Sequence, residues 1–280
     1  MKKQAVFTIL LLLSAFLLYE QGKSGMPDLP NKLNNISIGT IGNIPPPAGF
    51  ERVTVQPGSF GDYLRGLTLK KDKTVYLYDG TMKKNQSAQY AVVDISTGTK
   101  DLQQCADAIM RLRAEYYFGK HDFKSIKFPA SKSLAFNFAD YVAGTRYVYK
   151  GNNVAAVKPS ASICDTHDCL LKFMETVFIN CGTYTVDEMT HAIPMKDLQP
   201  GDLYVKGGAP GHAMLIVDVA VNKATGKKAY LLLQSYMPAQ DMHIVVNPND
   251  SNLSPWYEVN DNTKIVTPEW MFDAKQLKRF

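Results

Sequence analysis

The chain has 280 residues, a hydrophobic fraction of 45% and a formal net charge of +5 at pH 7. Its basic residues are scattered and form no stripe interleaved with aromatic side chains, which argues against a nucleic-acid-binding protein. Four cysteines in a chain of this length exclude a small disulfide-stapled scaffold, and the length allows one large domain with its own core.

The first 22 residues have the layout of a secretory signal. Two lysines precede an apolar run from Ala5 to Tyr19, and polar residues follow it. As a helix this run would span about 22 Å, less than the roughly 30 Å hydrocarbon core of a membrane. We therefore expect an exported protein of the periplasm or cell envelope. Segment 1–22 is either a cleaved signal peptide or a retained anchor that tethers the protein to the membrane.

Residues 23–50 are rich in Pro, Gly and Asn and show no sustained period, so a linker or extended arm is expected there. From residue 50 to 96 the chain alternates apolar and polar residues, punctuated by Gly, Pro and Asn, which is typical of strands. These strands should open a domain that covers residues 51–280.

The clearest helix of the sequence should begin at Asp101. Asp101 and Gln104 have the spacing of a capping box, and Gly119 is a stop signal. Residues at i, i+4, i+7 and i+11 form one face of this helix, which consists of Cys105, Ile109, Leu112 and Tyr116.

A second helix is expected after a cap at Asp165 or Thr166, and Gly182 should end it. Its buried stripe should consist of Leu170, Met174, Val177 and Cys181. Residues 120–160, between the two helices, have a mixed pattern in which some segments fit either helix or strand.

After residue 199 the pattern becomes that of an antiparallel sheet. The expected strands cover residues 203–205, 212–221, 229–234 and 243–246. The turn "NKATGKK" joins the second strand to the third, and a short terminal helix is expected after a cap at Thr267. The fold class is therefore expected to be α+β, with a long helix packed on an antiparallel sheet.

Cys105 is a candidate nucleophile because it lies in the first turn of the expected helix. Unpaired backbone N–H groups and the helix dipole favour a thiolate there, and the thiolate is the form that attacks carbonyl groups. The alternative is a packed cysteine, since Cys105 also begins the apolar stripe and a buried thiol behaves as a small hydrophobic group.

His212 opens an apolar strand directly after the loop "KGGAPG". The strand would hold its ring rigidly as a general base, and the loop would leave room for a substrate backbone. Gln234 ends the next strand and could accept the ring N–H, which would fix the tautomer of the imidazole. Both also have ordinary explanations, as a histidine satisfied by backbone and a polar residue at a strand end.

The order of these segments resembles the papain-like cysteine peptidases of the NlpC and CHAP type. The stretch "PGDLYVKGGAPGHAMLIVDV" is similar to their Gly-Asp before a short strand and Gly-His opening the next, and "QQCADAIMRLRAEYY" is similar to their nucleophile helix. The resemblance implies a papain-like core with Cys105 as nucleophile, His212 as base and Gln234 as orienting residue. An insertion around residues 120–195 is expected, because compact members have a shorter segment between cysteine and histidine.

The resemblance implies a thiol hydrolase that cleaves amide bonds in a cell-wall peptide or glycopeptide, most plausibly a peptidoglycan stem peptide. The backbone N–H of Cys105 and the side chain of Gln103 or Gln104 are oxyanion candidates, although both glutamines also fit solvated first-turn positions. The alternative is a catalytically inactive papain-like envelope protein that binds peptide or glycan in the same groove. The whole chain also resembles an exported Bacteroides-type family described only as a domain of unknown function.

The stretch "CDTHDC" places Cys164, His167 and Cys169 close together. These residue types suit zinc, but the spacing lacks the tight CxxC of a zinc knuckle. We expect either a disulfide, with Cys164 and Cys169 as candidate partners, or free packed thiols, and we expect no metal and no cofactor.

Several other polar residues receive structural explanations. Asp202 follows a Pro-Gly turn that accounts for it, and Asp218 should lie on the solvent face or be paired across the sheet. Three further histidines without visible partners are assigned to the surface or to turns, namely His121, His191 and His243.

Overall fold

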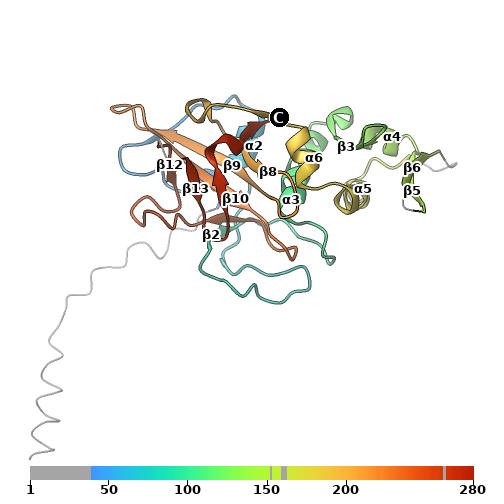
Figure 1. The fold of residues 1–280 in the computed structure, drawn as a ribbon, viewed down its shortest axis with the longest axis horizontal. Helices are drawn as coiled ribbons and strands as arrows, with labels where there is room; N and C mark the ends of the chain where they lie inside the picture. Colours follow the sequence, from blue (N-terminus) through green and yellow to red (C-terminus); the bar gives the residue numbers. More distant parts are fainter. Residues whose placement is uncertain (1–38, 152, 159–162, 261–262) are drawn as a thin grey trace, which may run out of the picture. The chain divides into compact units, whose positions relative to one another are not determined.

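A sheet of nine strands organises the described part of the chain, residues 39–280 without 152, 159–162 and 261–262, in this computed structural model (Figure 1). Its central path has the order β2-β11-β10-β9-β8-β15-β7, with β1 paired to β9 and β12 to β10, and every pairing is antiparallel. The strands are β1 (Glu51–Arg52), β2 (Gln89–Val92), β7 (His191–Ala192), β8 (Leu203–Lys206), β9 (His212–Val221), β10 (Lys228–Gln234), β11 (His243–Val245), β12 (Tyr257–Glu258) and β15 (Leu277–Arg279). The α+β class with a mostly antiparallel sheet is confirmed.

The helices lie between these strands in the chain. They are α2 (Phe60–Arg65), α3 (Cys105–Gly119), α4 (Phe138–Val142), α5 (His167–Asn180) and α6 (Thr183–Glu188), with short 3-10 turns η1 (Ile41–Asn43), η2 (Phe123–Ser125), η3 (Met195–Asp197) and η4 (Ala274–Gln276). The two long helices are those that the apolar periodicity predicts. The Thr166 side chain accepts the backbone N–H of Cys169 and so caps α5, as expected.

Most of the segment between α3 and β8, from η2 to α6, forms a group of hairpins and helices beside α3 (Figure 1). Strands β3 (Lys127–Ser131) and β4 (Leu134–Asn137) pair with each other, as do β5 (Arg146–Lys150) and β6 (Asn153–Val157). The ambiguous stretch at 134–142 contains both element types because Asn137 ends β4 and its side chain caps α4. This group occupies the region in which the sequence predicts an insertion.

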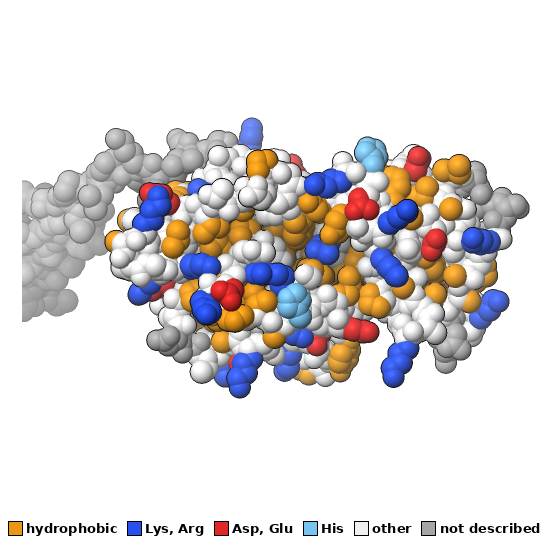
Figure 2. Space-filling model, turned by 90° about the horizontal axis from the view of Figure 1, so that it is seen from above, with side chains coloured by type: hydrophobic (Ala, Val, Ile, Leu, Met, Phe, Trp, Pro, Cys, Tyr) orange, Lys and Arg blue, Asp and Glu red, His pale blue; other side chains and the backbone are white. Residues whose placement is uncertain are grey.

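On the face shown in Figure 2, Lys and Arg side chains are dispersed between hydrophobic and uncharged surface. Within residues 39–280, as far as they are described, no helix is long and apolar enough to cross a membrane. The expected signal or anchor over 1–22, and the expected linker up to residue 38, lie outside the described residues.

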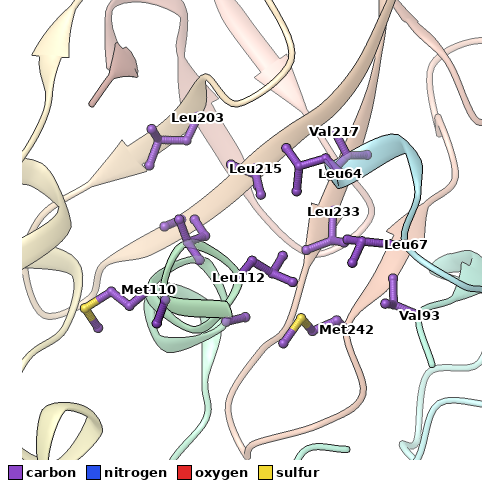
Figure 3. Close-up of a cluster of buried hydrophobic side chains, with 14 of the residues drawn as sticks. Leu64, Leu67, Val93, Met110, Leu112, Leu203, Leu215, Val217, Leu233 and Met242 are labelled. Atoms are coloured by element: carbon purple, nitrogen blue, oxygen red, sulfur yellow. The ribbon is translucent and has the colours of Figure 1, made fainter. Parts of the chain in front are cut away.

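One face of the central sheet is covered by helix α3. Met110 and Leu112 of α3 are fully buried, and they lie in one cluster with Leu203, Leu215 and Leu233 of the sheet (Figure 3). The odd-numbered residues at the start of β9 therefore face the helix, as expected from the two-residue repeat of a strand. Packing against this cluster fixes the start of α3 relative to the start of β9.

The opposite face of the sheet is buried as well. Met214 and Ile216 of β9 belong to a second cluster with Tyr230, Leu232 and Phe272. Phe272 belongs to strand β14 (Met271–Asp273), which pairs with β13 (Lys264–Val266) in a hairpin that covers this face. Burial on both faces explains why β9 reads as a nearly continuous apolar run rather than an alternating one.

Asp218 is the charged exception in β9, and it is fully buried. Its carboxylate accepts the Nε–H of Arg52 from β1 and of Arg65 from α2, each at 2.6 Å. Of the two positions left open by the sequence, the paired one is therefore observed, with partners from β1 and the α2 helix. Asp202 is also buried and paired, with Arg279 of β15, so turn chemistry alone does not account for it.

The linker prediction is wrong for residues 39–50, which belong to the folded unit. Ile41 and Ile44 are fully buried in the same core cluster as the apolar residues of α3 and β9. The backbone carbonyl of Pro45 accepts the indole N–H of Trp256 at 2.8 Å. Two isoleucines in an otherwise Pro- and Gly-rich stretch provide the apolar anchors that a composition argument overlooks.

The predicted terminal helix is wrong. The Thr267 hydroxyl donates to the backbone carbonyl of Trp270 and accepts the Trp270 N–H, so it closes a tight turn instead of capping a helix. The chain then continues through β14 and η4 to β15, which lies between β8 and β7 in the main sheet. Pairing in the sheet outweighs the local helical signal.

Candidate functional site

Helix α3 begins at Cys105, with Gln104 as its N-cap residue, and not at Asp101 as the spacing predicts. The Asp101 carboxylate instead accepts the backbone N–H of Ala239 at 2.7 Å and the Gln104 side-chain N–H at 3.0 Å. Asp101 thus holds a neighbouring loop, and the first free N–H groups of the helix belong to Cys105 and its successors. The thiol is therefore closer to the helix terminus than the sequence implies.

The Cys105 thiol is half-buried at the wall of a cavity of about 610 Å³. Burial raises the pKa of the thiol above its ordinary value, although hydrogen bonds from backbone N–H groups, first that of Ala213 in β9, oppose this. The contact with Ala213 places the sulfur beside the start of β9. A raised pKa means that the resting cysteine is a neutral thiol at pH 7.

His212 is the first residue of β9 and is almost fully buried. Its ring is packed among Tyr236, Trp270 and Phe272, with centroid distances of 4.7, 5.2 and 5.8 Å. This burial lowers the pKa of His212 to about 4, so the imidazole is neutral at pH 7. A neutral imidazole can accept a proton, as a general base requires.

Gly211 lets the chain enter β9 at this point. A Cβ atom at Gly211 would lie 2.3 Å from the Gly208 carbonyl oxygen and 2.5 Å from the Thr183 hydroxyl oxygen. Any side chain there would displace the loop from β8 or the start of α6, and with it the His212 ring. The Gly-His pair in the sequence is therefore required by close backbone packing.

Gln234 ends β10 and is also almost fully buried. Leu233 pairs with Leu215, so Gln234 lies diagonally across from His212 on the same face of the sheet. Gln234 Oε1 is 3.1 Å from His212 Nε2. The structure thus brings the predicted base and orienting residue into direct contact.

Cys105 and His212 line the same cavity, together with Asp107, Cys181, Tyr236 and Trp270. The volume of this cavity is within the range of small-ligand sites. Among the described residues no hydrogen bond joins the two side chains directly, and the Ala213 amide is the observed link between the sulfur and the histidine strand. Cys105 and His212 therefore line one cavity at the start of β9, and Gln234 contacts the His212 ring.

The two candidate oxyanion residues have different positions. Gln104 lines the cavity. Gln103 is buried away from it, where its Oε1 accepts a hydrogen bond from Arg111 at 3.2 Å, and it lines a separate pocket of about 120 Å³. The assignment of Gln103 as an oxyanion candidate is therefore wrong, because its side chain points to the other side of the loop that precedes α3, and so is its reading as a solvated residue.

Asp107 is a buried carboxyl at the wall of the cavity. Its Oδ2 accepts the backbone N–H of Gln104 at 3.0 Å, and its Oδ1 has no partner in the described structure. Burial raises the pKa of Asp107 to about 8. The burial of Asp107 could not be predicted from the sequence, because acidic residues are common in the first turn of a helix, where they complement its dipole.

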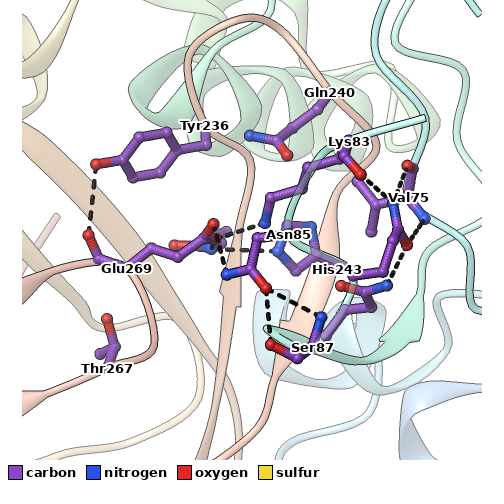
Figure 4. Close-up of polar contacts among 12 residues, drawn as sticks. Val75, Lys83, Asn85, Ser87, Tyr236, Gln240, His243, Thr267 and Glu269 are labelled. Atoms are coloured by element: carbon purple, nitrogen blue, oxygen red, sulfur yellow. Dashed lines mark hydrogen bonds and ion pairs between the residues drawn. The ribbon is translucent and has the colours of Figure 1, made fainter. Parts of the chain in front are cut away.

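Lys83, His243 and Glu269 belong to a group of buried and half-buried polar residues that the sequence does not reveal (Figure 4). The Gln234 Nε2 is 2.8 Å from Glu269 Oε2 and 3.1 Å from His243 Nε2, and Lys83 pairs with Glu269. The surface assignment of His243 is wrong, since this ring is fully buried. His191, by contrast, is exposed as expected, and so is His121.

Cys164 and Cys169 are joined by a disulfide, and Cys181 is a free thiol at the cavity wall. Burial raises the pKa of Cys181 to about 11. His167 contacts the Glu115 carboxylate of α3 at 2.8 Å. In the described ranges no group of three or more His, Cys, Asp or Glu side chains is placed to hold a metal ion.

Comparison with known proteins gives one result. A family model described as Domain of unknown function (4846) matches residues 41–279. No curated protein and no solved structure matches the chain. The matched range begins at the buried Ile41, in agreement with the inclusion of residues 39–50 in the folded unit.

Proposed function

The chain belongs to the family described as Domain of unknown function (4846), and we propose that this member is a thiol hydrolase that cleaves amide bonds. The observation that carries the proposal is the shared cavity of Cys105 and His212, with Gln234 Oε1 in contact with Nε2 of the ring. A nucleophile at a helix terminus, a base on a strand and an orienting group on the next strand are the parts that thiol catalysis needs.

The proposed fold assignment is a papain-like core. Three features support it: a cysteine that opens the long helix, an antiparallel sheet packed on that helix, and a histidine and a glutamine on adjacent strands. The hairpins and helices between α3 and β8 are then the inserted part. The substrate class, cell-wall peptides, is inferred from the resemblance to peptidases of the NlpC and CHAP type.

The proposed reaction proceeds through a thioester. His212 Nδ1 takes the proton of the Cys105 thiol as the sulfur attacks the amide carbonyl carbon, and the backbone N–H of Cys105 with the Gln104 side chain stabilises the oxyanion. The C–N bond then breaks, and the imidazolium gives its proton to the leaving amine. His212 next takes a proton from water, whose oxygen attacks the thioester carbon; the C–S bond breaks, the imidazolium returns its proton to the Cys105 sulfur, and the acid product leaves as its carboxylate.

The proposed substrate is a peptide of the cell wall, most plausibly a peptidoglycan stem peptide, met in the periplasm or envelope after export. The cavity supports an amide rather than an anionic substrate at the nucleophile. Its ionisable acidic groups are Asp101 and Asp107, and its lining residues include no Lys or Arg. Exposed Met237 and the Gly208–Gly211 loop border the same cavity and would contact an extended chain.

A second candidate function is a non-catalytic envelope protein that binds peptide or glycan in this cavity. The raised pKa of Cys105 favours it, because a neutral thiol without a direct hydrogen bond to His212 is a weak nucleophile at rest. The two functions differ in whether His212 changes the reactivity of Cys105.

Alkylation by iodoacetamide at pH 7, followed by peptide mass spectrometry, separates them. Cys181 lines the same cavity and serves as an internal reference for access of the reagent. In a hydrolase, Cys105 should be labelled faster than Cys181, and His212→Ala should abolish that difference. Equal labelling of both thiols in the wild type, or a rate at Cys105 that ignores His212→Ala, supports binding without catalysis. Release of new amine ends from isolated peptidoglycan, lost in Cys105→Ser, then tests the substrate class.

A further inference from the structure

The orientation of the Gln234 amide is determined by three neighbours of different kinds. Its Oε1 lies 3.1 Å from His212 Nε2, and its Nε2 lies 2.8 Å from Glu269 Oε2 and 3.1 Å from His243 Nε2. Oxygen and nitrogen of an amide side chain must be assigned from such partners. The identity of each neighbour as donor or acceptor therefore decides which way the amide points.

His243 can only accept a hydrogen bond from Gln234. Its Nδ1 is 2.8 Å from the backbone carbonyl of Asp241, and a carbonyl oxygen can only accept, so Nδ1 carries the hydrogen. Burial lowers the pKa of His243 to about 3, so the ring is neutral and its Nε2 has a free lone pair. The nearby Lys83 ammonium acts in the same direction.

Glu269 is the second acceptor on this side of the amide. Its carboxylate pairs with the buried Lys83 ammonium at 2.5 Å, and Asn85 Nδ2 lies 3.3 Å from its other oxygen (Figure 4). An inverted Gln234 would place its carbonyl oxygen against this carboxylate and against the His243 lone pair. The amide NH₂ therefore faces Glu269 and His243, and the oxygen faces His212.

This orientation sets the tautomer of His212. Gln234 Oε1 can only accept, so His212 Nε2 must carry the hydrogen and Nδ1 must carry the lone pair. The other groups around the ring are Tyr236, Trp270 and Phe272, which form no hydrogen bond to either nitrogen in the described structure. The other titratable groups that line the cavity are Asp101, Cys105, Asp107, Cys181 and Tyr236.

We propose that Glu269 is a positioning residue, whose carboxylate, paired with Lys83, orients the Gln234 amide and thereby holds His212 in its Nε2–H tautomer. The use of the freed Nδ1 as the proton acceptor of Cys105 rests on the proposed hydrolase function. The tautomer itself does not, and it can be measured in the folded protein without a substrate.

Nitrogen-15 and carbon-13 NMR of the His212 ring at pH 7 tests this directly. The wild type should show only the Nε2–H form. Lys83→Met with Glu269→Met replaces the ion pair by two apolar side chains, which avoids an orphaned buried charge. That variant should show a mixture of both tautomers, and its rate of Cys105 alkylation should fall roughly tenfold, because loss of the tautomer-fixing group of a triad costs up to about 10⁴ in turnover.

Two further variants make the test specific. Glu269→Gln keeps an acceptor that can face Gln234, so the Nε2–H form should recover in part, and this variant carries the test if the double variant does not fold. Asp202→Asn removes a buried carboxylate that pairs with Arg279 elsewhere in the sheet, and it should leave the tautomer and the alkylation rate unchanged.

The outcomes separate this proposal from the hydrolase proposal. A folded double variant, or a folded Glu269→Gln if the double variant does not fold, in which His212 stays entirely in the Nε2–H form overturns the role of Glu269. A shift of tautomer without any change in Cys105 alkylation upholds that role and counts against the hydrolase. A shift of both supports the two proposals together.

Discussion

His212 Nε2 and Gln234 Oε1 lie 3.1 Å apart across two neighbouring strands, and both side chains are almost fully buried. A buried hydrogen bond of this kind adds little net stability. Removing one of its partners is more costly, because the other partner is then a buried polar group without a hydrogen bond. Gln234 serves three partners at once, so its amide should matter to stability as well as to the site.

Replacement of Gln234 by methionine should therefore lower the free energy of unfolding by about 1–3 kcal/mol. His212 Nε2–H, Glu269 and His243 would each lose a hydrogen bond in a buried environment. Urea titration at pH 7 measures the change. Gln240→Met is a matched control, because this buried glutamine has an Oε1 without a partner in the described structure, and its loss should cost less. Equal costs would contradict the arrangement.

The rate of Cys105 alkylation should increase with pH and show no plateau between pH 5 and 8. Burial raises the pKa of the thiol, and His212, with a pKa of about 4, is already neutral in this range and forms no imidazolium to hold a thiolate. Alkylation is quenched after set times at a series of pH values, and mass spectrometry then gives the rate at Cys105 as a function of pH. A plateau that begins near pH 5 would show a thiolate–imidazolium pair instead.

Asp107→Asn should change how stability depends on pH. The carboxyl keeps its proton up to a pKa of about 8 in the folded protein, but loses it near its ordinary pKa of 3.8 when unfolded. Because the folded state binds the extra proton, this group lowers the free energy of unfolding as pH rises from about 4 to 8, by up to about 1.4 kcal/mol per pH unit. The variant should gain stability relative to the wild type across that window. If the difference in unfolding free energy between Asp107→Asn and the wild type is the same at pH 5 and pH 8, the burial of this carboxyl is contradicted.

Gly211→Ala should reduce both stability and the reactivity of Cys105. Its Cβ would meet oxygen atoms of Gly208, Thr183 and Lys206 within 2.7 Å, so the loop and the His212 ring must move. Thermal unfolding and alkylation at pH 7 measure the two effects. Gly119→Ala, at the end of α3 with open space around its Cβ, should be neutral or stabilising by up to about 1 kcal/mol. Unchanged alkylation in Gly211→Ala would argue against a tight coupling of this loop to the ring.

Asp218→Asn should lower the free energy of unfolding by about 3–5 kcal/mol, since it leaves the guanidinium groups of Arg52 and Arg65 without their buried counter-charge. Urea unfolding provides the value. The exposed pair of Lys100 and Glu175 is the contrast, and Glu175→Gln should cost less than about 1 kcal/mol. A small effect at Asp218 would mean that water or another group replaces the carboxylate.

The sequence predicts the part of the fold in which local signals agree with tertiary packing. The hairpin of β9 and β10 has long apolar strands and a turn closed by the Asn222 side chain, which accepts the backbone N–H groups of Ala224 and Thr225. Helix α5 has both a capping threonine and an apolar stripe. The hairpin predicts the proximity of His212 and Gln234, whereas the expectation that Cys105 joins them comes from the resemblance to papain-like peptidases.

The rest of the site depends on contacts that no local pattern encodes. Lys83 and Glu269 are 186 residues apart, and a lysine in a loop ordinarily lies in solvent. Glu269 follows a threonine and a proline that imitate a helix start, but that threonine closes a turn. His243 has no partner that the sequence reveals, because Gln234 reaches it only through the pairing of β10 with β11.

The shared carboxylate of Asp218 also constrains how relatives of this chain can diverge. Replacing Asp218 alone leaves the partly buried guanidinium groups of Arg52 and Arg65 without their counter-charge, and losing one arginine alone leaves the buried carboxylate with one of its two cationic partners. Relatives should therefore either keep all three charged residues at positions 52, 65 and 218 or replace all three together, for example by three apolar residues. In an alignment of the family these three columns should covary, although no two of them are adjacent in the sequence.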